Sequence, residues 1–136
     1  MKVVLRTLFA VVAGMAVALA LVVAVEGFSA IVYPIPADLT DDIPEHVRRY
    51  PDWILAVVVP AWGATATAAT WAASRLGGQV AGGIVALLLA WALVFNLTQL
   101  PYTMWFKVVM FVAFPVACLL GLRYGIRGAV TIRSVP

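Results

Sequence analysis

The chain has 136 residues, of which 65% are hydrophobic and 11% are charged, and its formal net charge is +3. Its mean hydropathy is +1.06. Soluble domains are about 45–50% apolar and about 25% charged, so the composition excludes an ordinary soluble domain and indicates an integral membrane protein. The length allows a single domain over residues 1–136. The one cysteine, Cys118, lies in an apolar run and excludes an intramolecular disulfide and a cysteine metal cluster.

Four apolar stretches are long enough to cross a bilayer, which takes roughly 20 residues. We expect spans at about 3–25, 53–73, 80–97 and 102–122. The apolar core of the first stretch is longer than the roughly 7–15 residues of a signal peptide, so we expect it to be a retained span. The sequence therefore predicts an all-α fold, a four-helix transmembrane bundle with antiparallel neighbours.

The joints between the last three stretches are short. "SRLGGQ" supplies Gly77 and Gly78, which tolerate the backbone angles of a tight turn. Pro101 prevents the third helix from continuing into the fourth. Asn96, near the end of the third stretch, is expected to be a helix C-cap because asparagine tolerates left-handed backbone angles.

The charges flanking the stretches predict an orientation. The external loop 27–52 is expected to be acidic, because its charged residues are Asp38, Asp41, Asp42, Glu45, Arg48, Arg49 and Asp52. The opposite side is purely basic and carries Lys2, Arg6, Arg75, Arg123, Arg127 and Arg133. Basic flanks stay in the cytoplasm, so we expect a multi-pass membrane protein with both termini cytoplasmic. Topology thus explains the positive charge, and we expect no nucleic-acid partner.

The acidic loop also contains a helix signal. Asp42 stands three residues before Glu45, as in a capping box, and Pro44 suits a first helical turn. An apolar stripe at helical spacing is formed by Ile43, Val47 and Tyr50. The pattern predicts a short amphipathic helix in the external loop, with the single histidine, His46, on its surface.

Small residues recur at four-residue spacing along the stretches, which lets membrane helices approach closely. The candidate helix-packing residues are Gly14, Gly63, Gly78, Gly82, Ala86, Ala113, Ala117 and Gly121. They could pack the bundle against itself, or form the interface of a homo-oligomer or of a membrane-protein partner. The three threonines of the second stretch, Thr65, Thr67 and Thr70, are expected to bond back to their own helix.

Two ionisable residues, Glu26 and Lys107, border or enter the apolar stretches at a similar depth on the outer side. Glu26 could mark the end of its helix, Lys107 could snorkel to the headgroups, or the two could pair. A functional proton or ion site is the remaining alternative. With the polar residues at the same level, they form a candidate outer polar cluster of Glu26, Tyr33, Asn96, Gln99 and Lys107.

Motifs for catalysis are missing from the sequence: it has no CxxC, HExxH, P-loop or dinucleotide-binding glycine pattern. No nucleophile accompanies His46 at a recognisable spacing. We therefore expect no enzymatic activity, no catalytic residues, no metal and no cofactor.

Two segments, "VEGFSAIVYPIPADL" and "FNLTQLPYTMWFKV", together resemble a family of small bacterial four-span integral membrane proteins that has no assigned function. In that family a glutamate precedes Tyr-Pro-x-Pro, and an asparagine precedes a proline and Trp-Phe. The matching residues are Glu26, Tyr33, Pro34, Pro36, Asn96, Pro101, Trp105 and Phe106. Lys107 departs from the apolar residue expected there. The resemblance implies a four-span fold and a location in the bacterial inner membrane but no substrate.

Two functions fit these observations. The first is a non-enzymatic inner-membrane protein that acts as an interaction or accessory protein through its outer loop or its small-residue helix faces. The alternative is a small channel, carrier or ligand-binding membrane protein that uses the outer polar cluster. In both cases the lipid bilayer is the immediate partner.

Overall fold

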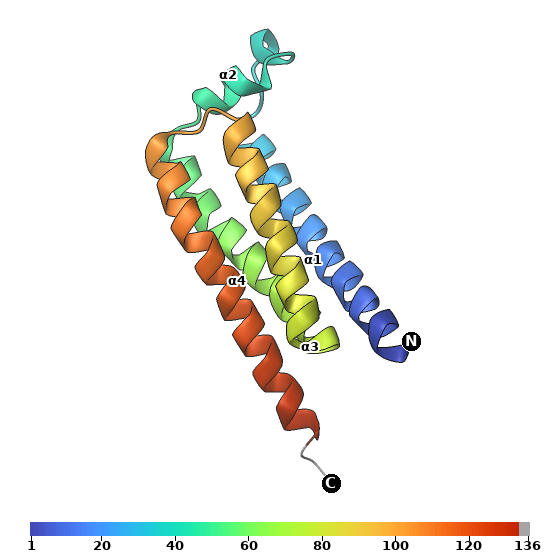
Figure 1. Cartoon of the computed structure of the whole chain (residues 1–136). Helices are drawn as coiled ribbons and strands as arrows, with labels where there is room; N and C mark the ends of the chain where they lie inside the picture. Colours follow the sequence, from blue (N-terminus) through green and yellow to red (C-terminus); the bar gives the residue numbers. More distant parts are fainter. Residues whose placement is uncertain (134–136) are drawn as a thin grey trace.

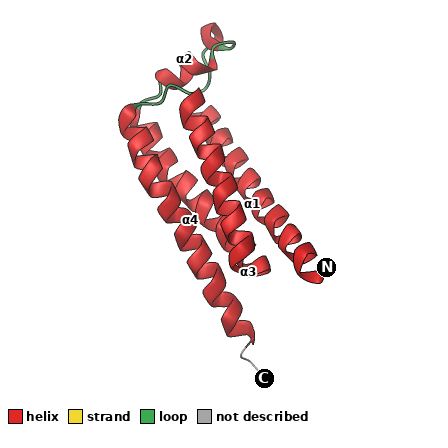
Figure 2. Cartoon of the chain, in the orientation of Figure 1, coloured by secondary structure: helices red, strands yellow, loops and turns green. Residues whose placement is uncertain are grey.

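The computed structural model describes residues 1–133, with side chains to residue 127, and this part of the chain is helical without strands (Figures 1 and 2). The elements are α1 (Lys2–Val32), the 3-10 helix η1 (Ala37–Leu39), α2 (Ile43–Arg48), α3 (Asp52–Gln99) and α4 (Met104–Arg133). Three of them, α1, α3 and the Met104–Arg127 part of α4, are long and apolar enough to cross a membrane. This agrees with the prediction of a membrane protein with transmembrane helices.

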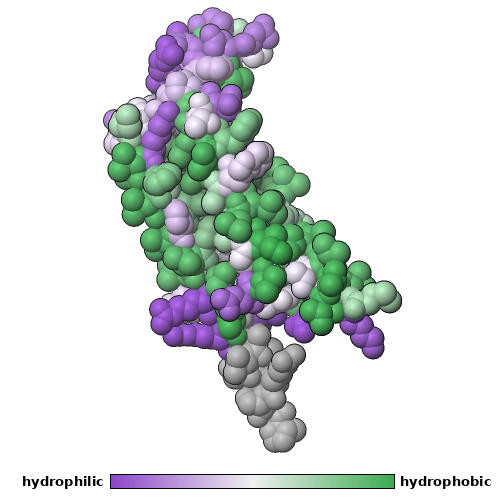
Figure 3. Space-filling view, in the orientation of Figure 1, coloured by the Kyte–Doolittle hydropathy of each residue, from purple (hydrophilic) through white to green (hydrophobic). Residues whose placement is uncertain are grey.

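The surface is divided as a membrane protein requires. Figure 3 shows hydrophobic residues over the middle of the visible face and hydrophilic residues at its two ends. Large apolar side chains such as Leu8, Leu87 and Phe111 are more than half exposed. In a bilayer these side chains contact lipid rather than water, so their exposure carries no penalty.

The helix α3 is interrupted at Gly78, where the backbone has φ 78° and ψ −168°. We call residues 52–77 the first arm of α3 and residues 79–99 its second arm. Figure 1 shows that the second arm folds back beside the first. The arms approach closely: a Cβ added at Gly82 would collide with the hydroxyl of Ser74. Gly78 itself has open space around it, so it serves the turn and not the packing.

Both α1 and α4 pack on α3 and not on each other, since no Cα atom of α1 lies within 8 Å of one in the described part of α4. Gly14 places α1 between the arms, because a Cβ there would lie 2.9 Å from Ala73 Cβ and 3.1 Å from Val85 Cγ2. Gly121 places α4 against the first arm, where a Cβ would collide with Thr70 and with the backbone of Thr67.

The remaining candidate packing residues are less enclosed. Ala117 is buried, whereas Ala86 and Ala113 are half-buried. A Cβ added at Gly63 would make an ordinary contact, 3.9 Å from Ala117 Cβ. The second arm instead buries larger side chains, which are Val85, Leu89, Leu93 and Leu97.

The threonine hydroxyls are bonded in two ways. Thr65 Oγ1 donates to Ala61 O at 2.9 Å and Thr70 Oγ1 to Ala66 O at 2.7 Å, as predicted for bonds within one helix. Thr67 Oγ1 instead donates to Ala117 O on α4 at 3.1 Å. The prediction for Thr67 is therefore wrong, because the close approach of α4 at Gly121 brings a carbonyl of the neighbouring helix within reach.

Two end-of-helix predictions have opposite outcomes. The N-cap of α2 is confirmed, since Asp42 Oδ1 accepts the Glu45 N–H at 3.0 Å. The prediction of Asn96 as a C-cap is wrong, because α3 continues to Gln99 and ends at Leu100 with φ −110° and ψ 140°. A residue before proline favours an extended backbone, so Pro101 ends the helix without a left-handed cap.

Candidate functional site

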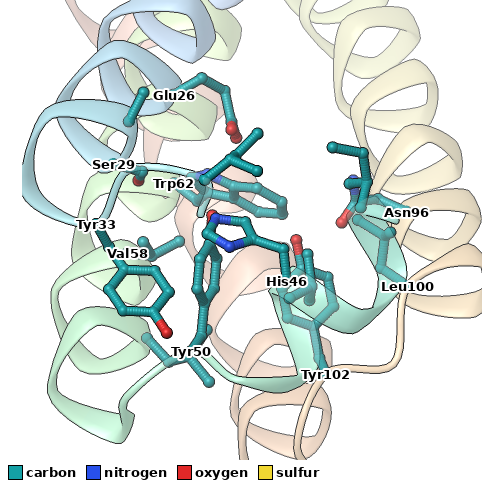
Figure 4. Close-up of a pocket in the computed structure, with 15 residues that line it drawn as sticks. Glu26, Ser29, Tyr33, His46, Tyr50, Val58, Trp62, Asn96, Leu100 and Tyr102 are labelled. Carbon is teal, nitrogen blue, oxygen red and sulfur yellow. The ribbon is translucent and has the colours of Figure 1, made fainter. Parts of the chain in front are cut away.

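A cavity of about 280 Å³ lies where the end of α1, the helix α2, the start of α3 and the connection to α4 meet. Its aromatic and polar lining consists of Glu26, Ser29, Tyr33, His46, Tyr50, Trp62, Asn96 and Tyr102 (Figure 4). Apolar side chains, among them Leu55 and Val58, complete the lining. We call this space the outer cavity.

One wall of the outer cavity is a cluster of three rings. Tyr33 stacks on His46 with ring centroids 5.1 Å apart, and Tyr50 meets both rings edge-on at 5.4 and 5.0 Å. Tyr33 Oη donates to Arg49 O at 3.2 Å, which ties the end of α1 to the end of α2. Edge-on and stacked contacts of this kind fix ring orientation, so the wall is preorganised.

The position of His46 corrects a prediction. His46 was expected on the surface of its helix, but it is only 3% exposed, while Ile43 is 43% exposed. The helix α2 has turned His46 and Val47 inward because α2 lies over the cavity, and the Tyr33 ring offers a stacking partner for the imidazole. Its neighbour Glu45 stays outside and pairs with Arg48 and Arg49 at 3.2 and 3.0 Å.

The opposite wall comes from the start of α4 and the first arm of α3. Tyr102 packs on Phe106 with centroids 4.9 Å apart, and Trp62 meets Phe106 edge-on at 6.4 Å. Trp105 Nε1 donates to Asp52 Oδ1 at 2.8 Å and joins the beginnings of α4 and α3. Phe106 is fully buried, so this wall is anchored in the core.

A second cavity of about 170 Å³ adjoins the first at a deeper level. Glu26, Trp62 and Asn96 line both spaces. The rest of the deeper lining is apolar except for Thr65, and it includes Val22 of α1 and Phe114 of α4. The three shared side chains therefore stand at the junction between a polar space and an apolar one.

Three atoms in the lining of the outer cavity are buried and lack a hydrogen-bond partner within the described residues: His46 Nδ1, Trp62 Nε1 and Asn96 Oδ1. Buried polar atoms in folded proteins are nearly always bonded to protein or to water. Unbonded polar atoms around one space therefore indicate that water or a ligand completes their bonding there.

The charge of Glu26 acts across the outer cavity. Burial raises the pKa of Tyr50, and the nearby charges of Glu26 and Tyr33 raise it further. Burial also raises the pKa of Tyr102, with smaller contributions from Glu26 and Tyr50. A carboxylate disfavours a second negative charge nearby, so these shifts locate both phenols in the field of Glu26.

The cavity unites three of the five residues of the candidate outer polar cluster, namely Glu26, Tyr33 and Asn96. Gln99 is exposed and lies outside the lining. Lys107 faces a different groove, between the second arm of α3 and α4.

A Glu26–Lys107 ion pair does not form. It requires α1 and α4 to be neighbours, and these helices make no contact in the described part of the chain. Ion pairs are found instead in the α2 region, where Arg48 and Arg49 meet Glu45 and Asp38.

Sequence reasoning missed four of the ring-bearing side chains of the cavity, which are His46, Tyr50, Trp62 and Tyr102, and also Ser29. A signal for the first two exists, because His46 and Tyr50 are four residues apart and share a face of a helical turn. For Tyr102 and Trp62 the interfacial preference of aromatic residues is a sufficient explanation, so the sequence does not mark them as cavity residues.

Comparison of the chain with protein-family models, with curated proteins and with solved structures gave no match. The functional assignment therefore relies on the geometry of the outer cavity.

Proposed function

We propose that the chain is a non-enzymatic protein of the bacterial inner membrane that crosses the bilayer four times and binds a small ligand in the outer cavity. The observation that carries the proposal is the cavity itself. It combines a carboxylate, two walls of aromatic rings and three buried polar atoms that lack partners. A concave site with an aromatic lining and a few convergent polar groups is the usual form of a small-molecule site.

The four crossings would be α1, the two arms of α3 and α4, with antiparallel neighbours. Each arm of α3 meets the roughly 20 residues that a crossing needs. The basic end of the molecule supports this arrangement, since Arg6 Nε of α1 donates to Leu76 O beside the Gly78 turn at 2.7 Å. The turn and the amino terminus would then share the cytoplasmic side, and the outer cavity would face outward. The resemblance to small four-span proteins fits the same topology.

The packing of the inner half favours ligand binding over an open pore. Gly14, Gly82 and Gly121 bring the helices into contact below the two cavities. A channel would need a continuous polar path, whereas this region is filled by close contacts between small residues and their neighbours.

The same contacts weigh against the accessory function through helix faces. Gly14 and Gly121 each pack against another helix of the same chain, and Gly82 packs against the other arm of α3. These small residues are therefore not available to a partner. An interaction through the acidic outer loop remains the second candidate function, supported by the exposed carboxylates of Asp38 and Asp41.

A cavity-filling variant tests the proposal. Ala30 lies on α1 and lines the outer cavity, so Ala30→Phe should fill part of it. Ala20→Phe makes the same change at an exposed position of α1 outside that lining and serves as the matched control. A library of small polar fragments would be screened for an increase in the melting temperature of the purified protein in detergent.

We expect fragments that stabilise the native protein and Ala20→Phe but not Ala30→Phe, since a ligand stabilises only the state that binds it. A library that yields no fragment with this dependence would contradict ligand binding in the outer cavity and leave the outer-loop interaction as the better candidate.

A further inference from the structure

The charge in the described lining of the outer cavity is negative and has no positive side chain to balance it. Among the described residues that line it, Glu26 is the carboxylate, and neither lysine nor arginine takes part. Arg48 and Arg49, which lie between the lining residues Val47 and Tyr50 in the sequence, are engaged with Glu45. A carboxylate at membrane depth is costly unless a positive partner is present. The cavity therefore lacks the charge that Glu26 would require in the bilayer.

The walls of the cavity suit a cation. Tyr33, Tyr50, Trp62 and Tyr102 contribute aromatic rings to the same lining as Glu26. Aromatic faces attract ammonium groups through their quadrupoles, and tryptophan and tyrosine do so best. A phosphate or carboxylate ligand would be disfavoured, because the ring faces and the Glu26 carboxylate would repel its negative charge. The described lining has no lysine or arginine to bind it.

The buried polar atoms that lack partners indicate which groups the ligand carries. Asn96 Oδ1 is an acceptor, and His46 Nδ1 accepts when the imidazole is neutral with its proton on Nε2. Both are electron-rich atoms that can lie against the positive end of an ammonium group, whether that group carries N–H bonds or N-methyl groups. Trp62 Nε1 is a donor, so it can bind a hydroxyl oxygen elsewhere on the ligand.

The size of the cavity and the charge around it both favour a small cation. A cavity of about 280 Å³ lies just below the roughly 300–1,000 Å³ typical of sites for drug-sized ligands, so the ligand is small. The segment that covers the cavity carries the acids Asp38, Asp41, Asp42, Glu45 and Asp52 against the two bases Arg48 and Arg49. A surface with an excess of acid raises the local concentration of cations.

We propose that the outer cavity binds a small organic ammonium ion, held by the Glu26 carboxylate between the aromatic walls. The inference rests on the proposed ligand-binding function and adds the chemical class of the ligand. The same ammonium group could belong to a free amine or to the headgroup of an amine-bearing lipid, since the cavity lies at the outer end of the helices.

The test uses three molecules of nearly equal shape. Choline is the cation, 3,3-dimethylbutan-1-ol replaces its nitrogen by carbon and is neutral, and 3,3-dimethylbutanoate is an anion. Binding of each to the full-length protein would be measured by equilibrium titration and by the change in melting temperature. We expect choline to bind at least about tenfold more tightly than the neutral molecule, because only choline interacts with Glu26 and with the ring quadrupoles as a charge.

Glu26→Gln should remove this preference while keeping the shape of the side chain. The matched control is Asp41→Asn, which neutralises an exposed carboxylate in the acidic segment outside the lining of the cavity. Asp41→Asn should keep the tenfold preference, so a loss specific to Glu26→Gln would exclude a general effect of surface charge. An unchanged melting temperature of the ligand-free variant would show that Glu26→Gln still folds.

The source of the ammonium group is separated in nanodiscs. If an amine-bearing headgroup occupies the cavity, phosphatidylethanolamine should weaken choline binding relative to nanodiscs of phosphatidylglycerol alone. Equal choline affinity in both would identify a free amine as the ligand.

The inference can be overturned with or without the proposed ligand-binding function, and the outcomes of the two experiments distinguish these cases. Equal or tighter binding of the neutral or the anionic molecule in the cavity would refute the ammonium class but retain the ligand-binding function. If choline does not bind, but fragments stabilise the native protein and not Ala30→Phe, the ammonium class is likewise refuted and the ligand-binding function is retained. If no molecule in either experiment depends on the cavity, the proposed function fails as well.

Discussion

Glu26 is positioned by the continuation of α1 beyond the apolar stretch. The helix runs to Val32, so Glu26 lies inside it and not at its end. Helical geometry then places Glu26, Ser29 and Ala30 on one side, facing the cavity. This explains how a single carboxylate comes to line one cavity with side chains from α2, from both arms of α3 and from the connection before α4.

The phenols near Glu26 give a prediction about pH. The raised pKa of Tyr102 means that the fold favours the protonated phenol, so this contribution to stability is present below the ordinary value of 10.0 and is lost as the pH rises through the folded pKa. Because the pKa of Tyr50 is raised as well, a spectrophotometric titration should show more than one tyrosine ionising later than free tyrosine, and Tyr102→Phe should reduce the amplitude of that late step. Glu26→Gln should shift the step to lower pH, because the carboxylate contributes to the shift. A late ionisation step that is unchanged in both variants would contradict the placement of Tyr102 near Glu26.

The helix pair α3–α4 depends on the absence of a side chain at Gly121. A Cβ there would collide with Thr70 Oγ1 and with the backbone of Thr67. Gly121→Ala should therefore destabilise the protein by about 1–3 kcal/mol through overpacking, although alanine is the better helix former. Gly63→Ala is the matched control, because its Cβ would make an ordinary contact at 3.9 Å, and it should be neutral or stabilising by up to about 1 kcal/mol. Unfolding in mixed micelles measures both. Equal effects at the two positions would exclude a special role for Gly121.

The reversal within α3 depends on Gly78. Its φ of 78° with ψ of −168° is accessible to glycine and strained for other residues, so Gly78→Ala should cost about 1–3 kcal/mol. Gly83→Ala offers a control in the second arm, where a Cβ would meet nothing within 4 Å. Stability in detergent should fall for Gly78→Ala and not for Gly83→Ala. The reverse order would show that the turn does not need this backbone conformation.

The sequence predicts these elements unevenly, for physical reasons. Apolar length identifies the helices, and the Asp42 cap predicts α2, because both signals are local. The four-residue spacing of His46 and Tyr50 indicates a shared face, but the inward turn of that face depends on the Tyr33 ring, which lies on another element. The same holds for the separation of Lys107 from Glu26, because depth along a helix is readable from sequence whereas the order of helices around a bundle is not.

At the scale of the molecule, the candidate site is a product of the whole arrangement. The outer cavity takes residues from α1, α2, both arms of α3 and the connection before α4. The covering segment is fixed by the Tyr33–Arg49 bond, and the starts of α3 and α4 are fixed by the Asp52–Trp105 bond. A small polar site thus forms at one end of a bundle whose opposite end is closed by packing. The direction of that end relative to the membrane then decides from which compartment a ligand enters.

The proposed four crossings make a prediction about that direction. In a Cys118→Ala background, single cysteines would be placed at the exposed positions Asp41, Gln79 and Gln99. Because Gln79 follows the Gly78 turn, it should react with a membrane-impermeant maleimide only after the inner membrane is opened. Asp41→Cys and Gln99→Cys should react in intact spheroplasts. If α3 crossed the bilayer once as a continuous helix, position 79 would lie in the hydrocarbon and react from neither side, and positions 41 and 99 would label from opposite sides. That pattern would refute the four-span topology and, with it, the outward opening of the cavity.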